Sequence, residues 1–337
     1  MSEEASGKKE ILNYIKYYIE SEDAKKIKES ADIVNEEGFN IWSFKKLIFL
    51  EYYIKPYLSI LLNRGYKCLF IDFFSSCGIN KINKGEVYVL GSPIISLLKG
   101  VIPNKSKGRN NRFHKWYFID NQENFCKALN LRVNEASKII NEKYKEKLEI
   151  GKDIKILCGD CNKKITEVVE DIKKEYKEDK IAVLAFIDPY KFSDIDWETW
   201  KRLLDLIYVD IIFTFPILTV KRGISQCKDK EKCLPPTLVK LFKNNIGIPD
   251  DKFGELYAED IVDLVKRPVS FYRKGISVKN TINGELYRIE LFTHSKAAMK
   301  ITLDIAKKLD SINALDLKSI IEQINGKLRS LNDYQKT

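Results

Sequence analysis

Apolar and polar positions alternate along the middle of the chain in a way that predicts strands separated by helices. Five short apolar runs have the length and residue types that strands favour: 68–74, 116–119, 154–157, 181–187 and 209–215. The segments between them carry apolar residues at helical spacing: 92–98, 124–148, 162–177 and 197–206. Repeated strand–helix alternation with apolar strands predicts a mostly parallel sheet covered by helices on both faces.

Helical patterns precede this alternating region. Residues 1–40 are highly charged and place apolar residues at helical spacing, which predicts one or two surface helices. Residues 42–62 form a more apolar amphipathic helix, with a kink or break expected at Pro56 and an end at 63–65.

The pattern changes after residue 215. Residues 216–267 interrupt the alternation and contain two consecutive prolines, so we expect an insertion there. Strand patterns at 268–278 and 285–293 flank an Asn-Gly pair at 283–284, which is a strong hairpin signal. Helical patterns from 296 to 331 close the chain.

These patterns divide the chain into three parts. We expect a helical N-terminal extension at 1–64, an α/β domain at 65–300 with an insertion at 216–267, and C-terminal helices at 301–337. The domain would contain a seven-stranded sheet made of five parallel strands and a C-terminal antiparallel hairpin.

The composition allows a large apolar core and a basic surface. Of the 337 residues, 44% are hydrophobic, and the net charge of +10 suits an anionic partner such as nucleic acid. No apolar run reaches transmembrane length, and the N-terminus lacks the apolar segment of a signal peptide. We therefore expect a cytoplasmic protein that does not enter a membrane.

The seven cysteines are too sparse for a disulfide scaffold and are odd in number, so we expect reduced thiols. Cys158 and Cys161 form a C-x-x-C motif, and Cys227 and Cys233 could complete a set of four thiolates. A zinc site is therefore the alternative.

Acidic residues follow four successive predicted strands: Asp72, Asp120, Asp160 and Asp188. In an open α/β sheet, ligands bind outside the carboxyl ends of the strands. A carboxylate after the second strand suits a ribose diol, and one after the third suits an exocyclic amine. The motif G-x-G-x-x-G, expected of a dinucleotide-binding domain, is absent after the first strand.

Several segments resemble the three-Cys-motif partner protein (TcmP) family, a group similar to class I S-adenosylmethionine (SAM) methyltransferases. They are WSFKKLIFLEYYIKPYL (42–58), FIDFFSSCGIN (70–80), GSPIISLL (91–98), FIDNQENFCKAL (118–129), CGDCN (158–162), FIDPYKFSDIDWETW (186–200), DIIFTFP (210–216) and ELYRIELFTHSKAAMKI (285–301). The resemblance implies a Rossmann-like class I methyltransferase fold, SAM as cofactor, and a three-Cys-motif protein, itself similar to radical-SAM proteins, as partner.

The resemblance also implies roles for individual residues. Asp72, Ser75 and Gly78 would cradle the methionine and ribose side of SAM, and Asp120 would hold the ribose hydroxyls. Asp160 and Cys161 would flank the adenine. The family loop is closer to D-x-F-A-G-x-G, so Ser75 and Ser76 stand where Ala and Gly are usual.

Asp188, Pro189 and Tyr190 resemble the D-P-P-Y motif of amino-methyltransferases, with one proline in place of two. In such a motif the carboxylate accepts a hydrogen bond from the target amine and the aromatic ring stacks on the base. The chemistry would then consist mainly of positioning and desolvation.

Each of these residues also has a purely structural interpretation. Asp72 and Gly78 could form an ordinary strand-to-helix turn, and Asp120 and Asp160 could cap the helices that follow them. The two aromatic residues Tyr190 and Phe192 could pack in the core beside the sheet edge.

Two segments of the chain are strongly basic. The first, 101–115, has no acidic residue and contains Lys105, Lys107, Arg109, Arg112 and Lys115. The second, 221–243, has only two acidic residues. Nucleic-acid contacts from Lys105, Lys107, Arg109 and Arg112 are one interpretation, and a solvated loop is the other.

Together, these observations favour a SAM-dependent methyltransferase-like protein that methylates an amine of a nucleic-acid base. The alternative is a partner or scaffold subunit that kept the fold and lost turnover, for which the altered glycine loop is the evidence. A metal-dependent nuclease is a third interpretation, but the sequence lacks a clustered acid–lysine pattern. The two histidines, His114 and His294, do not form a recognisable hydrolase motif.

Overall fold

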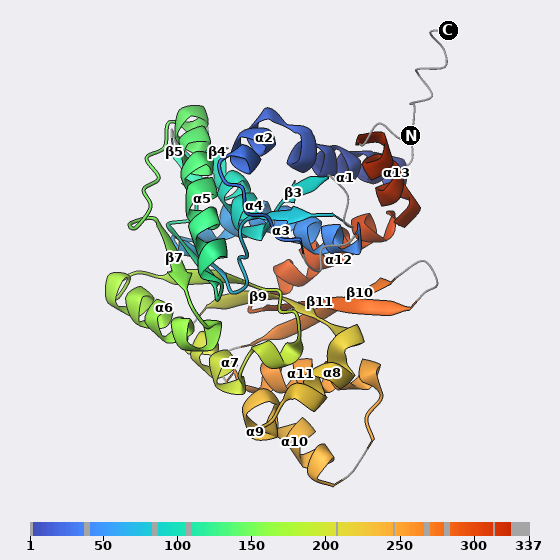
Figure 1. Ribbon diagram of the computed structural model, residues 1–337. Helices are drawn as coiled ribbons and strands as arrows, with labels where there is room; N and C mark the ends of the chain where they lie inside the picture. Colours follow the sequence, from blue (N-terminus) through green and yellow to red (C-terminus); the bar gives the residue numbers. More distant parts are fainter. Residues whose placement is uncertain are drawn as a thin grey trace.

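A seven-stranded sheet forms the centre of the protein (Figure 1). The computed structural model describes residues 3–36, 41–82, 87–104, 109–206, 208–244, 247–265, 270–279, 284–312 and 314–324. The strands of the sheet are β1 (Lys67–Asp72), β6 (Lys115–Asp120), β7 (Ile154–Cys158), β8 (Ile181–Ile187), β9 (Val209–Phe215), β10 (Tyr272–Lys279) and β11 (Glu285–Thr293).

The strand order is β10-β11-β9-β8-β1-β6-β7. The five strands from β9 to β7 are parallel, and β11 runs antiparallel to both of its neighbours, β9 and β10. The predicted α/β architecture is confirmed: this is a mostly parallel seven-stranded sheet with a C-terminal antiparallel hairpin.

The sheet separates two apolar core layers, because successive side chains of a strand point to opposite faces. In β1, Cys68 and Phe70 belong to the first layer, whereas Leu69 and Ile71 belong to the second. Every residue of β9 is buried. Burial on both faces explains why the strands appear in the sequence as continuous apolar runs.

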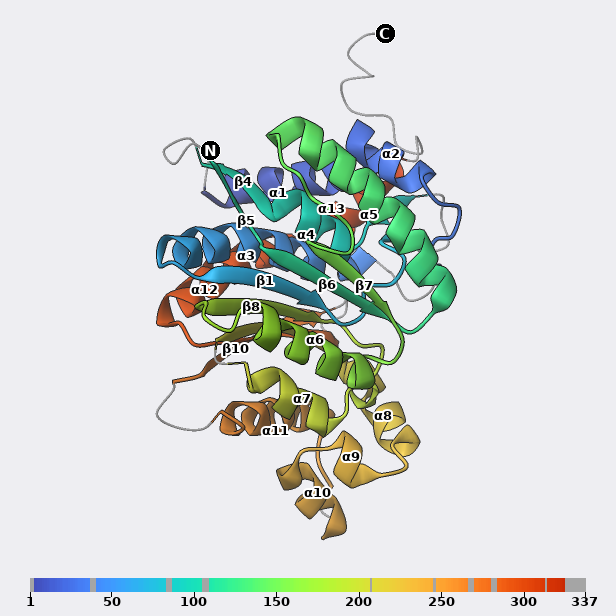
Figure 2. The ribbon, with the colours of Figure 1, turned by 90° about the vertical axis from the view of Figure 1, so that its left-hand side faces the viewer.

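Helices cover both faces of the sheet (Figure 2). Those that contribute to the first layer are α1 (Glu3–Glu20), α2 (Glu22–Glu29), α3 (Phe44–Asn63), α4 (Ser92–Lys99), α5 (Glu123–Tyr144), α12 (Lys296–Asp310) and α13 (Ala314–Ile324). Those that contribute to the second are α6 (Cys161–Glu175), α7 (Trp197–Leu204), α8 (Val220–Gln226), α9 (Lys230–Cys233), α10 (Pro236–Lys243) and α11 (Asp250–Asp263).

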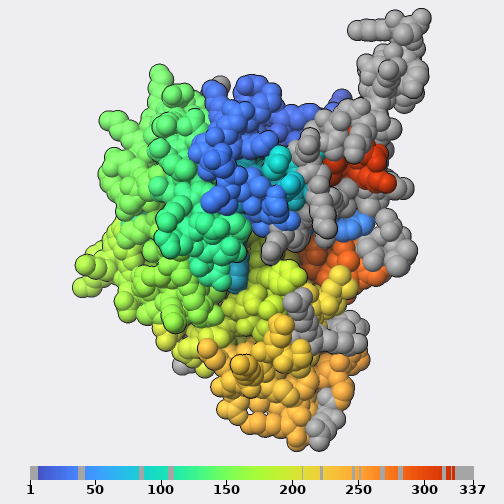
Figure 3. All heavy atoms as spheres, viewed as in Figure 1, coloured from blue at the N-terminus to red at the C-terminus, as the bar shows by residue number. Residues whose placement is uncertain are grey.

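The N-terminal helices are part of the same core as the sheet. Ile11, Ile15 and Tyr18 of α1 are almost fully buried in the first layer. Their burial needs the other helices as partners, so α1 is not merely a surface helix. At the other end of the molecule, the helices of the segment after β9 form a projection (Figure 3).

The structure also differs from the sequence-based expectations in its secondary structure. Helix α3 continues through Pro56 instead of breaking there. The basic segment 101–115, expected as a loop, contains the antiparallel pair β4 (Val101–Asn104) and β5 (Arg109–Arg112). A further short pair, β2 (Ile79–Lys81) and β3 (Tyr88–Leu90), follows the loop after β1.

Candidate functional site

The carboxyl ends of the parallel strands bring the predicted acidic residues to one edge of the sheet. Asp72 ends β1 and Asp120 ends β6, and these two strands are direct neighbours. Asp188 follows β8, which pairs with β1 on its other side. Asp160 follows β7 at the outer end of this row. This edge of the sheet is the candidate site.

Asp72 is the most unusual residue of this edge, because it is a fully buried carboxyl group. Its Oδ1 atom accepts a hydrogen bond of 3.2 Å from the backbone N–H of Phe74. Within the described part of the chain, its Oδ2 atom has no hydrogen-bond partner. A buried polar atom without a partner is costly, so it marks a place where a ligand could supply the missing donor.

The pKa of Asp72 is raised to about 7, mainly by burial. The nearby carboxylates of Asp188 and Asp120 raise it further, whereas the Ser92 hydroxyl and the Phe74 N–H oppose the shift. A positively charged ligand group beside Asp72 would relieve both the burial cost and the repulsion among the acids.

The loop after β1 is held in a strained but well-bonded conformation. Ser76 has a φ angle of 52°, in the left-handed region that favours glycine. Its backbone N–H donates a 2.8 Å hydrogen bond to Oδ2 of Asp120. Gly78 has a φ angle of 82° and accepts a 2.8 Å hydrogen bond from the N–H of Gly91. The serine therefore adopts the glycine-like conformation.

Ser75 links the end of β1 to the end of β6 through hydrogen bonds. Its hydroxyl donates to the carbonyl oxygen of Asp72 (3.1 Å) and accepts from the N–H of Ile119 (3.0 Å). Its own backbone N–H donates to the Ile119 carbonyl (2.9 Å). Ser75 is buried, and it fixes the separation of the two loops that carry Asp72 and Asp120.

Asp120 lies half-buried between these loops. One carboxylate oxygen accepts from Ser76, and the other accepts a 2.9 Å hydrogen bond from the N–H of Gln122. Burial raises its pKa, and these backbone donors oppose the shift. Each oxygen has a second lone-pair direction, so the carboxylate can still accept from a ligand hydroxyl.

Asp160 and Cys161 lie at the start of α6, and Asp160 caps this helix, as one of its two interpretations predicted. Asp160 is the N-cap residue of α6, and its Oδ1 atom accepts a 2.9 Å hydrogen bond from the N–H of Asn162. The Cys161 thiol is buried and donates to the carbonyl oxygen of Asp194 at 3.8 Å. Burial raises the pKa of this thiol to about 12.

The residues after β8 behave differently from one another. Oδ2 of Asp188 lies 2.5 Å from Nζ of Lys46, which belongs to α3. Pro189 is buried, and the Tyr190 side chain is 58% exposed. Phe192 is fully buried and stacks on Phe215, so it is a core residue.

Lys46 is the site residue that the sequence did not indicate. It lies near the start of α3, far from Asp188 in the sequence, and no local pattern links the two residues. Tyr287 of β11 lies in the same region: its hydroxyl donates to the carbonyl oxygen of Trp42. Burial, and then the charge of Asp188, holds the pKa of Tyr287 well above its usual value. Elements from both ends of the chain thus complete this edge.

The described part of the first basic segment lies near the amino ends of β1 and β6, away from the candidate site. Lys105 and Lys107 lie outside the described residues, and Arg109 belongs to β5. The Arg112 guanidinium is paired with Glu146 (3.1 Å) and Asp153 (3.5 Å), so its charge is neutralised locally. A pocket of about 370 Å³ is present beside it.

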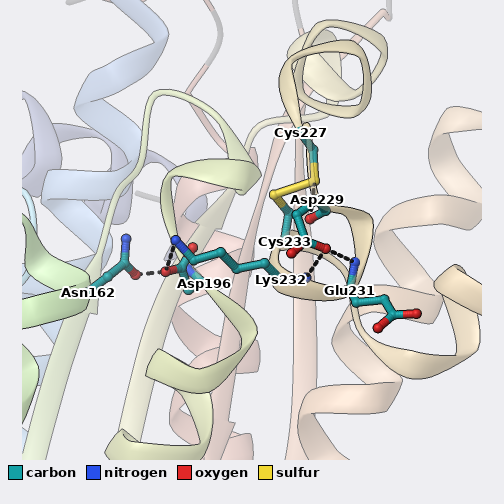
Figure 4. Close-up of a disulfide and its surroundings, with 7 residues drawn as sticks. All are labelled: Asn162, Asp196, Cys227, Asp229, Glu231, Lys232 and Cys233. Carbon is teal, nitrogen blue, oxygen red and sulfur yellow. Dashed lines mark hydrogen bonds and ion pairs between the residues drawn. A yellow bond between two sulfur atoms is a disulfide. The ribbon is translucent and has the colours of Figure 1, made fainter.

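Five of the seven cysteines are free thiols, as expected, and two are not. Cys227 and Cys233 form a disulfide that joins α8 to α9, which corrects the prediction that they are reduced thiols (Figure 4). Cys158 is exposed and Cys161 is buried in the second core layer. Among the described residues there is no group of three or more His, Cys, Asp or Glu side chains that could hold a metal.

The segment with the disulfide contacts the start of α7. Nζ of Lys232 lies 3.0 Å from Oδ2 of Asp196. The N–H of Asp196 in turn donates a 2.8 Å hydrogen bond to Oδ1 of Asn162, near the candidate site (Figure 4).

In the described part of the chain, no helix is long and apolar enough to span a bilayer.

Comparison with known proteins gives structural similarity only. No protein-family model and no curated protein matches the chain. Among solved structures, LPL1258 from Legionella pneumophila has 10% sequence identity and a TM-score of 0.45, over 77% of this chain and 90% of that chain. Trm1 from Pyrococcus horikoshii, in complex with S-adenosyl-L-methionine, has 13% identity and a TM-score of 0.37.

The match to Trm1 covers 77% of this chain and 58% of the Trm1 chain. TYW2 from M. jannaschii, in complex with AdoMet, has 7% identity and a TM-score of 0.30, over 71% of this chain and 74% of that chain. These values are too low to carry an assignment of activity, which has to be argued from the geometry of this chain.

Proposed function

We propose that this chain is a SAM-dependent methyltransferase-like protein that transfers a methyl group to an amine, with a nucleic-acid base as the acceptor. The main observation in support is the state of Asp72. Its carboxyl group is buried near Asp120 and Asp188, and its Oδ2 atom has no hydrogen-bond partner among the described residues. SAM has a positively charged ammonium and sulfonium, and it would supply an electrophilic methyl group. Its positive charge would complement the buried carboxyl group of Asp72, whereas Asp188 already has Lys46 as a partner.

The remaining cofactor contacts would come from the neighbouring loops. Ser75 and Gly78 shape the loop that approaches the ligand, and the second lone pairs of Asp120 suit a ribose diol. Asp160 and Cys161 would border the adenine, because they follow β7 beside Asp120. In this arrangement the protein binds and orients, and it excludes water from the buried side of the site.

Asp188, Pro189 and Tyr190 would receive the acceptor. A base amine would donate a hydrogen bond to Asp188, in competition with the Lys46 ammonium that lies 2.5 Å away. The exposed Tyr190 ring would stack on the base. With its hydrogen-bonded N–H held by the carboxylate, the amine would direct its lone pair toward the methyl group.

Removal of the ribose contact tests the cofactor site. In calorimetry with S-adenosylhomocysteine, Asp120→Ala should weaken binding by about 1.5–3 kcal/mol, the range for a hydrogen bond to a charged group. The methyl group is absent from this ligand, so the measurement reports binding without turnover. Wild-type protein that does not bind at millimolar ligand would rule out the proposal.

The acceptor site is tested with Asp188→Ala. This variant should lose methyl transfer to mixed RNA and DNA while it binds S-adenosylhomocysteine nearly as wild type does, because Asp188 is assigned to the acceptor. Asp120→Ala is the matched control, since it should fail at the binding step. Undiminished transfer by Asp188→Ala would remove Asp188 from the mechanism.

A partner subunit without turnover is the second candidate function, and the loop after β1 favours it. Ser76 adds a Cβ atom at a left-handed position beside the proposed ligand, and Lys46 already occupies the acceptor carboxylate. Such a subunit would serve a three-Cys-motif protein. The same calorimetry separates the two, because only the enzyme requires the cofactor.

A further inference from the structure

Two thiols from different elements meet at the edge that carries the acids. Cys158 is the last residue of β7 and is exposed, whereas Cys126 lies in the first turn of α5 and is 7% exposed. Asp120 connects them. It is the register partner of Cys158 across β6 and β7, and its carbonyl oxygen accepts a 3.4 Å hydrogen bond from the Cys126 thiol.

Cys158 alternates along β7 with Ile154 and Ile156, which pack in the first core layer with α5, so its side chain points to the face of the sheet that carries Cys126. After burial, Cys158 is the next cause that raises the pKa of the Cys126 thiol. The C-x-x-C neighbour, Cys161, is bonded instead to the carbonyl oxygen of Asp194. The thiol on the same face of the sheet as Cys158 is therefore Cys126, whereas Cys161 belongs to the second core layer.

We propose that Cys126 and Cys158 are a modification site: a dithiol that closes to a reversible disulfide beside Asp120 and thereby weakens the proposed cofactor site. The disulfide stands on the placement of both cysteines around Asp120. Its effect on cofactor binding rests on the proposed function.

The reaction is thiol–disulfide exchange with a small disulfide such as glutathione disulfide. The exposed Cys158 thiolate attacks one sulfur, the S–S bond of glutathione disulfide breaks, and one glutathione thiolate leaves. Cys126 then loses its proton and displaces the second glutathione. Two protein thiols are oxidised, one glutathione disulfide is reduced to two thiols, and the protons end on those thiols.

The Cys126 step becomes easier once Cys158 has reacted. Part of the rise in the pKa of Cys126 comes from the Cys158 side chain, and in a mixed disulfide that side chain no longer has a thiol. The product has no S–H group, so the Asp120 carbonyl loses its donor on Cys126 and keeps only the 2.8 Å hydrogen bond from the N–H of Gly159.

The first experiment maps the bond. Full-length protein with Cys227→Ser and Cys233→Ser, which removes the other disulfide, is treated with glutathione disulfide, digested without reduction and analysed by mass spectrometry. A cross-linked peptide pair containing Cys126 and Cys158 is expected. It should vanish with Cys126→Ser or Cys158→Ser and persist with Cys161→Ser, the matched control.

A bond between Cys158 and Cys161 would overturn the proposal. So would Cys158 that carries glutathione but never exchanges it for Cys126, because that result would show that the two thiols do not meet. The added Cys161→Ser variant keeps the test decisive even if one of the other variants folds poorly.

The second experiment measures the coupling in the same background. Oxidation should weaken S-adenosylhomocysteine binding about 2- to 10-fold, the effect of one net hydrogen bond, and dithiothreitol should restore it. Binding to the Cys158→Ser variant should not respond to oxidation. Equal affinity of the oxidised and reduced forms would overturn the coupling. If even the reduced protein does not bind, the proposed function and the coupling fail together, and the mapped bond still decides the modification site.

Discussion

At the scale of single residues, Asp72 makes stability depend on pH in an unusual direction. Its pKa rises from 3.8 in an exposed carboxyl group to about 7 in the folded protein. Between these values the folded chain holds a proton that the unfolded chain releases. The contribution of Asp72 to stability is therefore greatest near pH 4 and is lost as the pH rises through 7.

Asp72→Asn removes this titration. Relative to wild type, the variant should gain stability from pH 5 to pH 8, up to a limit of about 4 kcal/mol set by the shift from 3.8 to about 7. Urea unfolding at several pH values measures the difference. Asp171→Asn is the control. The pKa of Asp171 is lowered, chiefly by hydrogen bonds from Lys155 and Tyr117 against the opposing effect of burial, so its effect should not change over this range. A pH-independent difference for Asp72→Asn would contradict the assignment.

At the scale of elements, the turn after β1 requires glycine for two separable reasons. Gly78 has a φ angle of 82°, and a Cβ atom there would lie 3.0 Å from Leu129 and 3.1 Å from Ile94. Gly65, at the turn before β1, has a φ angle of 80° and no atom within 4 Å of that position. The pair separates the cost of the backbone conformation from the cost of crowding.

Gly65→Ala should cost about 1–2 kcal/mol of unfolding free energy, the penalty of a left-handed conformation. Gly78→Ala should cost about 1–3 kcal/mol more, because the side chains around it must move. Chemical denaturation of both variants measures the two costs. Equal losses would mean that Leu129 and Ile94 give way without cost, and that only the backbone matters at Gly78.

The elements also show what the sequence could and could not predict. The strands were predictable because burial on both faces produces continuous apolar runs, and Asp160 could be expected to cap a helix because capping is local. Lys46 was not predictable, because its contact with Asp188 joins positions 142 apart through the packing of α3. Cys126 was missed for the same reason, since its partner Cys158 belongs to another strand-and-helix unit.

At the scale of the whole molecule, the net charge is +10, but some basic side chains are already paired with acidic residues and cannot neutralise a polyanion. Arg112 is already paired with Glu146 and Asp153. Lys105, Lys107 and Arg109 therefore carry the prediction of nucleic-acid binding. Replacing Lys105, Lys107 and Arg109 by Gln should flatten the salt dependence of binding, by about 0.7–0.9 in log–log slope for each phosphate that the variant no longer neutralises.

Fluorescence anisotropy with a labelled single-stranded oligonucleotide over a range of salt concentrations measures this slope. Arg112→Gln is the control: it should leave the slope unchanged and lower stability, since it leaves two acids without their cation. An unchanged slope in the triple variant would direct the search for a nucleic-acid surface to 221–243.

The position of β11 between β9 and β10 has a consequence for how the protein is made. Synthesis proceeds from the N-terminus, so β10 leaves the ribosome before β11, the strand with which it pairs. Until residue 293 has emerged, the growing chain presents the unpaired edge of β9, the kind of edge on which aggregation begins. The last strand to be synthesised is therefore the one that closes the sheet, and a chain that stops before it leaves both β9 and β10 open to other chains.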